Sequence, residues 1–304
     1  MTPFSPRPVM FGEVVFDRFP DGSAVLGGAP FNVAWHLRGF GENPLFISRV
    51  GDDEAGRRVR LAMHNWDMDC AGLQIDPEHP TGAVHIQLVD GEPVFDILPK
   101  QAYDYITLAE VPPLDLVAFI YHGSLALRSA ESHATLESLV RRRTTSVFLD
   151  VNLRAPWWSA AEIQRWMVYA DWVKLNRHEL EQLAPGINGG LGEGADDALT
   201  RARRLIARYD LRGLLLTLGE AGALALTAMG DSESITPAST TEVIDTVGAG
   251  DAFTSVFLLG HLRNWPLAVT LQRAQDFASA IVGVRGATVA DHSFYQCFLN
   301  HWNE

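Results

Sequence analysis

Small residues stand directly before an apolar helical pattern near the end of the chain, where Asp245–Phe253 reads DTVGAGDAF. Glycine and alanine let backbone N–H groups approach an anion closely, and a helix N-terminus adds about half a unit of positive charge. Gly248, Ala249 and Gly250 are therefore suited to cradle a transferring phosphoryl group. Asp251 follows in the first turn, where a carboxylate can accept the proton of an attacking hydroxyl. The alternative is a glycine turn with Asp251 as an ordinary N-cap.

Short β-rich runs alternate with helical patterns along the chain, and several runs are apolar on both faces, as strands of a covered parallel sheet are. This alternation predicts a doubly wound α/β sandwich with a mostly parallel central sheet. We expect strands at Val9–Phe16, Pro44–Val50, Leu116–Tyr121, Ser146–Val151, Trp172–Leu175 and Leu214–Leu218. We expect helices at Pro30–Phe40, Glu54–Trp66, Glu131–Val140, Ala160–Tyr169, Ala195–Tyr209, Ala249–Leu262 and Ala268–Val284.

One stretch breaks the alternation: Ala83–Val89 and Glu92–Leu98 read as a β-hairpin joined at Asp90-Gly91. A small β lid over the open end of the main sheet would give this pair something to cover. Ligands of such sheets usually bind at that same end, beyond the carboxyl termini of the strands. We therefore expect one domain, with a lid near the ligand. The domain spans residues 1–304, and the lid comes from about 13–26 and 81–105.

The acidic composition excludes several classes of function. A formal net charge of −13 argues against a nucleic-acid partner, because phosphate backbones are bound mainly through clustered Lys and Arg. The only lysines, Lys100 and Lys174, lie in neither a GxxxxGK[ST] loop nor a VAIK-like strand, so backbone amides, arginine and a metal must handle any phosphate. Cys70 and Cys297 are too few for a disulfide framework. No apolar run approaches the roughly 20 residues of a membrane-spanning helix, and no signal peptide is evident, so we expect a cytoplasmic protein without a membrane partner.

The segment DTVGAGDAF resembles the C-terminal signature of the ribokinase-like, or PfkB, carbohydrate kinases, and a second signature agrees with it. Gly27–Ala34, GGAPFNVA, resembles the N-terminal GG-x-x-x-N-x-A motif of that family. Its glycines permit close approach of a ligand, and Asn32 offers a donor and an acceptor to sugar hydroxyls. A glycine turn leading into a helix is the alternative. Further segments match in family order over nearly the whole chain: Gly12–Asp17, Val50–Gly56, Gly123-Ser124, Asp150–Arg154, Asn176–Glu179 and Thr217–Gly222.

The resemblance implies a ribokinase-like three-layer sandwich and gives roles to individual residues. On the substrate side, Asp17 would hold two sugar hydroxyls beside Gly27, Gly28 and Asn32. Arg154 would meet a phosphate or a sugar oxygen. A simple turn residue at Asp17 and a surface charge at Arg154 are the alternatives. On the nucleotide side, ATP would lie against Asn176, Thr217, Gly219, Gly222 and Ser279.

The resemblance also implies metal ions. Asn176 and Glu179 would position the hydrated Mg²⁺ that accompanies ATP, a role suited to oxygen ligands acting through water. A polar helix start with a capping box explains the same two residues, and both interpretations can hold together. Gly286, in VRGAT, resembles the element that builds a monovalent-cation loop with Asp245 and Val247, so K⁺ is an optional cofactor.

The implied reaction is transfer of the γ-phosphate of MgATP to a primary hydroxyl of a small sugar, with Asp251 as base and Gly248–Gly250 as anion hole. The opening GEVVFDRFPDG, the form GGAPFN and the segment DVNLRAPWW look most like bacterial fructokinases, so fructose is the expected substrate. Another sugar or a nucleoside, such as ribose, adenosine or a keto-deoxy sugar, is the alternative. A non-catalytic sugar-sensing regulator is the alternative from another class. We expect a monomer, or a homodimer formed through the lid.

Overall fold

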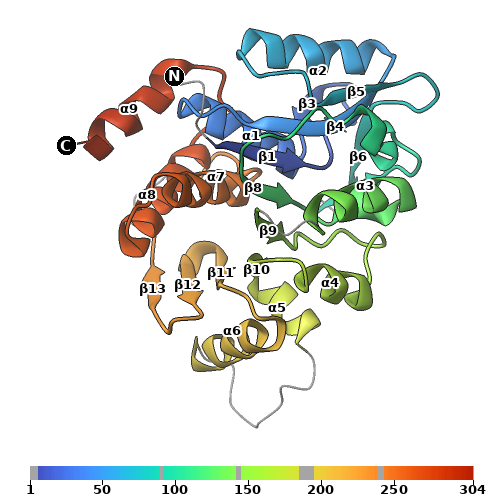
Figure 1. Ribbon diagram of the computed structural model, residues 1–304. Helices are drawn as coiled ribbons and strands as arrows, with labels where there is room; N and C mark the ends of the chain where they lie inside the picture. Colours follow the sequence, from blue (N-terminus) through green and yellow to red (C-terminus); the bar gives the residue numbers. More distant parts are fainter. Residues whose placement is uncertain (1–5, 90–91, 142–144, 185–194, 238–242, 304) are drawn as a thin grey trace.

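A nine-stranded sheet in the order β13-β12-β11-β10-β9-β8-β1-β4-β5 runs through the middle of the molecule (Figure 1). The computed structural model describes residues 6–89, 92–141, 145–184, 195–237 and 243–303. Neighbouring strands are parallel from β11 to β5, whereas β12 and β13 at the opposite edge are antiparallel. The strands are β1 (Arg7–Phe11), β4 (Leu45–Gly51), β5 (Leu73–Asp76), β8 (Val117–His122), β9 (Ser146–Asp150), β10 (Trp172–Asn176), β11 (Gly213–Thr217), β12 (Ala223–Thr227) and β13 (Ser232–Ile235).

Helices cover both faces of this sheet and bury two separate apolar cores (Figure 1). Successive side chains of a strand point to opposite faces, so Phe119 of β8 lies in one core and Ile120 in the other. This arrangement confirms the predicted α/β fold class. One face carries α1 (Ala29–Gly39), α2 (Glu54–Asn65), α7 (Ala249–Leu262), α8 (Leu267–Ile281) and α9 (His292–Asn303). The other carries α3 (Ala130–Val140), α4 (Ala160–Met167), α5 (Arg177–Leu183) and α6 (Ala195–Tyr209).

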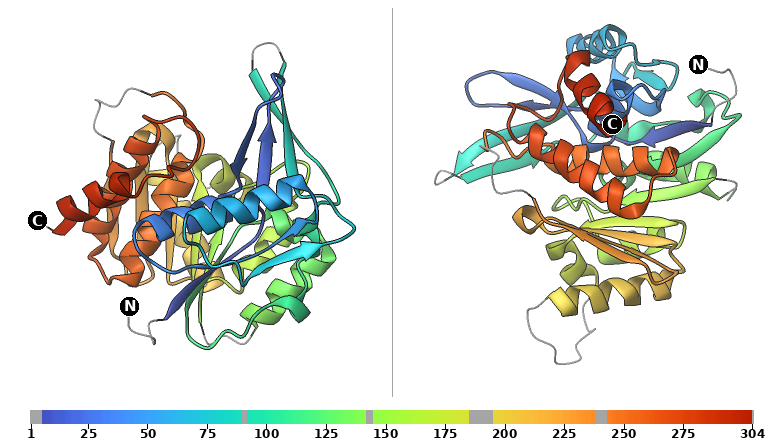
Figure 2. Two further views of the ribbon diagram at one scale, coloured as in Figure 1. Left: turned by 90° about the horizontal axis from the view of Figure 1, so that it is seen from above. Right: turned by 90° about the vertical axis from the view of Figure 1, so that its left-hand side faces the viewer.

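A second, four-stranded sheet in the order β3-β2-β6-β7 projects from one end of the main sheet (Figure 2, blue and teal strands). Its outer pairs β2–β3 and β6–β7 are antiparallel, and β2 pairs with β6 in parallel. The predicted turn at Asp90-Gly91 lies outside the described residues, and the role of this sheet as a lid stays a prediction. The strands are β2 (Val15–Arg18), β3 (Ala24–Gly27), β6 (Gly82–Val89) and β7 (Glu92–Ile97).

The prediction of a single strand over Val9–Phe16 was wrong. The chain turns at Gly12, whose φ of +147° favours glycine and where an added Cβ would stand only 2.7 Å from Cγ of Pro30. Strand β1 therefore ends in the main sheet at Phe11, and β2 begins in the second sheet at Val15. The residue between them, Glu13, stands at the junction of the two sheets.

Within the described part of the chain, no helix is both long enough and apolar enough to cross a membrane.

Candidate active site

The carboxyl ends of the central parallel strands place several polar residues side by side. Strand register pairs Asp150 with Lys174 and Asn176 with Thr217, so β9, β10 and β11 end at one edge. Phe11 of β1 is in register with His122 of β8, which extends the same edge across the sheet. Because the strands are parallel, the loops that follow them converge at this edge.

The N-terminus of α7 meets α1 at this edge. Gly248 caps α7 with a left-handed φ of +82°, and no side chain makes a capping hydrogen bond there. Asp251 is not the N-cap: its Oδ2 accepts a hydrogen bond of 2.8 Å from Nδ2 of Asn32 in α1. A Cβ at position 248 would stand 2.5 Å from that of Ala287, which requires glycine. The first amides of α7 are thus left without a side-chain cap, as an anion hole requires.

Two charged residues to which the sequence patterns gave no role lie beneath this helix start. Nζ of Lys174 donates to Oδ2 of Asp150 at 2.7 Å, and the hydroxyl of Tyr121 donates to the same oxygen at 2.9 Å. The Lys174 side chain is only 9% exposed, and its Nζ is 3.6 Å from where a Cβ on Gly250 would stand. Lys174 is therefore a buried cation directly below the proposed anion hole.

The electrostatic balance at Asp251 follows from this arrangement. Loss of hydration raises the pKa of the Asp251 carboxyl, although the residue keeps some solvent exposure. The positive charge of Lys174 and the hydrogen bond from Asn32 oppose that rise, whereas Asp150 adds to it. Arg154, exposed in the loop after β9, also lowers this pKa. A carboxylate with a raised pKa binds a proton more readily, which suits a general base.

The predicted sugar-binding residues Asp17, Gly27 and Asn32 come together from β2, β3 and α1. A Cβ added to Gly27 would stand 3.7 Å from Oδ2 of Asp17 and 3.8 Å from Oδ1 of Asn32, so all three surround one space. Gly28 has a φ of +111°, and a Cβ there would stand 2.8 Å from the carbonyl oxygen of Glu13. Burial raises the pKa of Asp17 to about 6, and Arg154 opposes the rise. These residues surround the space predicted for the sugar.

The predicted nucleotide-side residues lie along the next part of the edge. Thr217 ends β11, and the following turn has left-handed glycines at Gly219 and Gly222, with φ of +62° and +95°. A Cβ at Gly222 would overlap the carbonyl oxygen of Ile235, so β12 can begin there only with glycine. Ser279 lies on α8, where its Oγ accepts from Nε2 of Gln275 at 3.0 Å.

Asn176 and Glu179 form a capping box at the start of α5. Oδ1 of Asn176 accepts from the Glu179 amide at 2.9 Å, and Oε2 of Glu179 accepts from the Asn176 amide at 2.8 Å. Oε1 of Glu179 accepts from the Leu153 amide at 2.8 Å. Each oxygen keeps a second lone pair, so the pair fits a hydrated cation held through water. Burial raises the pKa of Glu179, and the charge of Asp150 adds to the rise.

The predicted monovalent-cation loop is also brought together. Oδ1 of Asp245 accepts from the Val247 amide at 3.0 Å, and Oδ2 accepts from the Gly286 amide at 3.0 Å. A carboxylate thus joins the segment before α7 to the segment after α8, which fits the loop that the resemblance implies.

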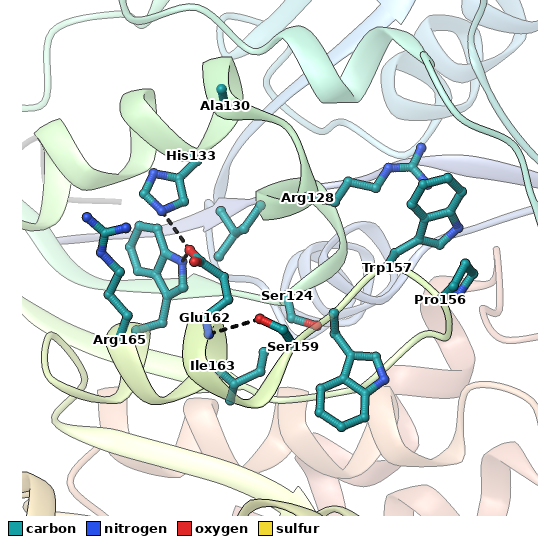
Figure 3. A pocket seen from close by; sticks show the side chains of 13 residues that line it. Ser124, Arg128, Ala130, His133, Pro156, Trp157, Ser159, Glu162, Ile163 and Arg165 are labelled. Atoms are coloured by element: carbon teal, nitrogen blue, oxygen red, sulfur yellow. Dashed lines mark hydrogen bonds and ion pairs between the residues drawn. The ribbon is translucent and has the colours of Figure 1, made fainter.

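A cavity of about 590 Å³ lies to one side, between α4 and the short helix η3 (Leu125–Arg128) (Figure 3). His133 and Glu162 form a 2.7 Å pair in its wall, and the guanidinium of Arg128 lies over Trp157 at 4.4 Å. Among its described lining residues, Ser124, Pro156, Trp157 and Trp158 belong to segments that resemble the family, but none is among the residues to which the resemblance gives a ligand role. We therefore place the candidate site at the strand ends rather than in this cavity.

Comparison with known proteins identifies the family. The family model described as pfkB family carbohydrate kinase matches residues 4–293. The fructokinase of Klebsiella pneumoniae is 32% identical over 302 residues, which cover 92% of this chain and 94% of that protein. The aminoimidazole riboside kinase of Salmonella typhimurium is 31% identical over 284 residues, 87% of this chain and 84% of that protein. A fructokinase double mutant from Vibrio cholerae, solved with fructose, ADP and potassium, has a TM-score of 0.81 at 25% identity and covers 97% of this chain and 98% of that one.

Proposed function

The chain belongs to the pfkB family of carbohydrate kinases and is an ATP-dependent sugar kinase, and we propose that it phosphorylates fructose at a primary hydroxyl. One contact supports the chemistry above all others: the 2.8 Å hydrogen bond from Asn32 to Asp251. It joins the predicted sugar-binding motif on α1 to the predicted base on α7, 219 residues along the chain. A hydroxyl held beside Asn32 is thereby brought to the carboxylate that would take its proton.

In the proposed mechanism, each part of the site has one task. Asp17 and Asn32 hold the sugar so that its hydroxyl faces the γ-phosphate, which supplies proximity and orientation. Asp251 accepts the hydroxyl proton as the new bond from the sugar oxygen to the γ-phosphorus forms and the bond from that phosphorus to the bridging oxygen breaks, which releases ADP. The uncapped amides at Gly248–Gly250 stabilise the negative charge on the transferring phosphoryl group, and Arg154 contributes from the opposite loop.

The proposal includes metal cofactors. Asn176 and Glu179 would hold Mg²⁺ through water, and the ion would neutralise charge on the nucleotide phosphates. Asp245, Val247 and Gly286 would form the K⁺ loop. The same proposal places the enzyme in the cytoplasm, as a monomer or as a homodimer joined through the second sheet.

We expect fructose to have the highest kcat/KM among fructose, tagatose, ribose, adenosine, aminoimidazole riboside and 2-keto-3-deoxygluconate. The fructokinase relatives support fructose as the substrate. The riboside kinase at 31% identity makes aminoimidazole riboside the strongest competitor. An ADP-release assay measures all six. A competitor with a kcat/KM tenfold higher would replace fructose as the substrate. Sugar binding by calorimetry without ADP release from any of them would instead identify a regulator.

Asp17→Ala should weaken fructose binding by about 1.5–3 kcal/mol for each well-made hydrogen bond that is lost, because a carboxylate acceptor disappears. ATP binding should stay unchanged, since Asp17 lies on the sugar side of the site. Asp21→Ala is the matched control, because Asp21 is an exposed carboxylate in the turn that follows the same strand and accepts only from Ser23 within the described residues. Calorimetry that shows ATP weakened as much as fructose would make Asp17 a structural residue.

A further inference from the structure

Glu13 stands at the crossing from the main sheet to the second sheet, and no step of the proposed reaction uses it. Its side chain points into the molecule, since the residue is only 4% exposed. Both carboxyl oxygens lie 3.9 Å from the position of a Cβ on Gly123, just beyond the end of β8. The carboxyl group therefore lies at the same edge of the sheet as the candidate site.

The carboxyl of Glu13 is incompletely hydrogen bonded. Among the described residues, its Oε2 has no hydrogen-bond partner although the atom is fully buried. The hydroxyl of Tyr103 and Nη1 of Arg128 are likewise buried without a well-aligned hydrogen bond in that part of the chain, although Arg128 lies over the Tyr103 ring and acts on its hydroxyl. Leaving such a group unsatisfied costs stability, so its retention points to a partner of another kind.

These three groups act on one another. The charges of Arg128 and Glu13 both influence the Tyr103 hydroxyl, and the Arg128 guanidinium lies 5.2 Å from the centre of the Tyr103 ring. Two other nitrogens of Arg128 are held by Asp104 at 2.7 and 2.8 Å, which fixes the guanidinium. Tyr103 itself lies in η1 (Ala102–Tyr105), shortly after the second sheet ends.

Charged groups from several elements influence the Glu13 carboxyl. The charges of Asp251 in α7, Asp150 in β9 and Arg154 in the loop that follows β9 all act on it. The charge of Arg154 acts on Asp17 and Asp251 as well, so one guanidinium influences all three acidic side chains. The carbonyl oxygen of Glu13 lies 2.8 Å from the position of a Cβ on Gly28, a predicted sugar-binding residue, so Glu13 adjoins that part of the site.

Burial raises the pKa of Glu13 to about 7, with Arg154 opposing the rise and Asp251 adding to it. Near neutral pH the carboxyl is therefore present in both its protonated and its ionised form. A protonated carboxyl donates one hydrogen bond and accepts others, while an ionised one only accepts. A sugar hydroxyl can also donate and accept, so it fits either form.

We propose that Glu13 binds a non-reacting hydroxyl of the sugar and is a specificity residue for neutral polyols. The inference rests on the proposed sugar kinase activity. A sugar hydroxyl would satisfy the unpartnered Oε2 of Glu13. The hydroxyl of Tyr103 is the neighbour best placed to bond the same sugar hydroxyl. A sugar acid would bring a carboxylate next to Glu13, Asp17 and Asp251, and like charges at such a site repel.

Glu13→Met tests the proposal, because methionine keeps the length of the side chain and removes its hydrogen bonds. We expect kcat/KM for fructose to fall about 10- to 100-fold, the range for a hydrogen bond to a charged or buried group, with KM for ATP unchanged. We expect the melting temperature to stay the same or to rise, because the variant removes an unsatisfied buried carboxyl. For Glu13→Gln, kcat/KM for fructose should fall far less, since the glutamine amide can still form a hydrogen bond with a hydroxyl.

Singly deoxygenated fructose analogues identify the contact. Each analogue should bind the wild-type enzyme more weakly than fructose does, because one hydroxyl is missing. The Glu13→Met variant should bind fructose and the analogue that lacks the hydroxyl bound by Glu13 equally well. Asp76→Asn is the control, because Asp76 is equally buried at 3% exposed and is bonded to Arg49 and His79. It should lower stability and leave kcat/KM for fructose unchanged.

Two results would overturn the assignment. The first is a lower melting temperature for Glu13→Met with near-normal kcat/KM for fructose. The second is that, for every analogue, the loss of affinity from the missing hydroxyl adds to the loss from the Glu13→Met substitution. If another sugar of the panel proves to be the substrate, the fructose proposal fails by itself. The same comparison on that sugar and its deoxy analogues then decides the role of Glu13.

Discussion

Asp251→Asn should fold and bind both substrates yet turn over about 10²- to 10⁴-fold more slowly, the usual contribution of a positioned general base. That loss corresponds to roughly 3–5.5 kcal/mol of activation barrier. Gly248 caps α7, so the substitution leaves the helix start intact, and the new amide oxygen can still accept from Asn32. Only the group that attracts the hydroxyl proton is lost. Steady-state kcat at saturating fructose and MgATP measures the effect.

Asp53→Asn is the matched control for this experiment. Asp53 is a true N-cap: its Oδ1 accepts from the Gly56 amide at 2.7 Å, and its Oδ2 accepts from the Thr81 amide at 2.9 Å. We expect a stability loss of about 1–3 kcal/mol with a normal kcat, because the variant disturbs the cap and the hydrogen bonds that Asp53 accepts from Thr81. If kcat of Asp251→Asn stays within about threefold of wild type, this variant behaves like the Asp53→Asn control. Asp251 then has no catalytic role.

The predicted motifs were recognisable because their residue types are dictated locally. Gly248 needs a left-handed φ and space beside Ala287, and Gly28 needs the same freedom beside the backbone of Glu13. The positive φ is a demand of the local backbone, so it leaves glycines at fixed places in the motifs, whereas the close contacts with Ala287 and Glu13 form only in the folded chain. The strand–helix alternation that predicted the α/β class is equally local, since it depends only on periodicity.

Lys174 and Asp150 were missed because their importance depends on strand register. The patterns WVKLN and FLDVN each place one charged residue in an apolar strand, and a buried charge in such a strand needs a partner. The sequence therefore signalled that each charge needs a partner, but it did not show which charges pair. Only the parallel pairing of β9 with β10 brings Asp150 and Lys174 together. Glu13 was missed for a related reason, since the apolar run Val9–Phe16 hid the break at Gly12 that separates two sheets.

Lys174→Met should move the acid limb of the kcat–pH profile to higher pH. Among the charged groups that act on Asp251, Lys174 opposes the rise in its pKa most strongly, so removing the cation raises that pKa further. The base must be ionised to act, and a higher pKa leaves less of it ionised at a given acidic pH. Lys100→Met is the control, because Lys100 is exposed and is the only other lysine of the chain. Its profile should match that of the wild type.

Stability gives a second readout of the same variant. Burial lowers the pKa of Lys174, but Asp150 and its acidic neighbours raise it above the ordinary value, so the cation persists. Lys174→Met would leave Asp150 buried without its cation, which costs about 3–5 kcal/mol. Lys174→Met/Asp150→Asn removes both charges and should recover much of that loss. Because Lys174 acts on Asp251 more strongly than Asp150 does, the acid limb of the double variant should return only part of the way. A folded variant with the wild-type acid limb would limit Lys174 to a structural role.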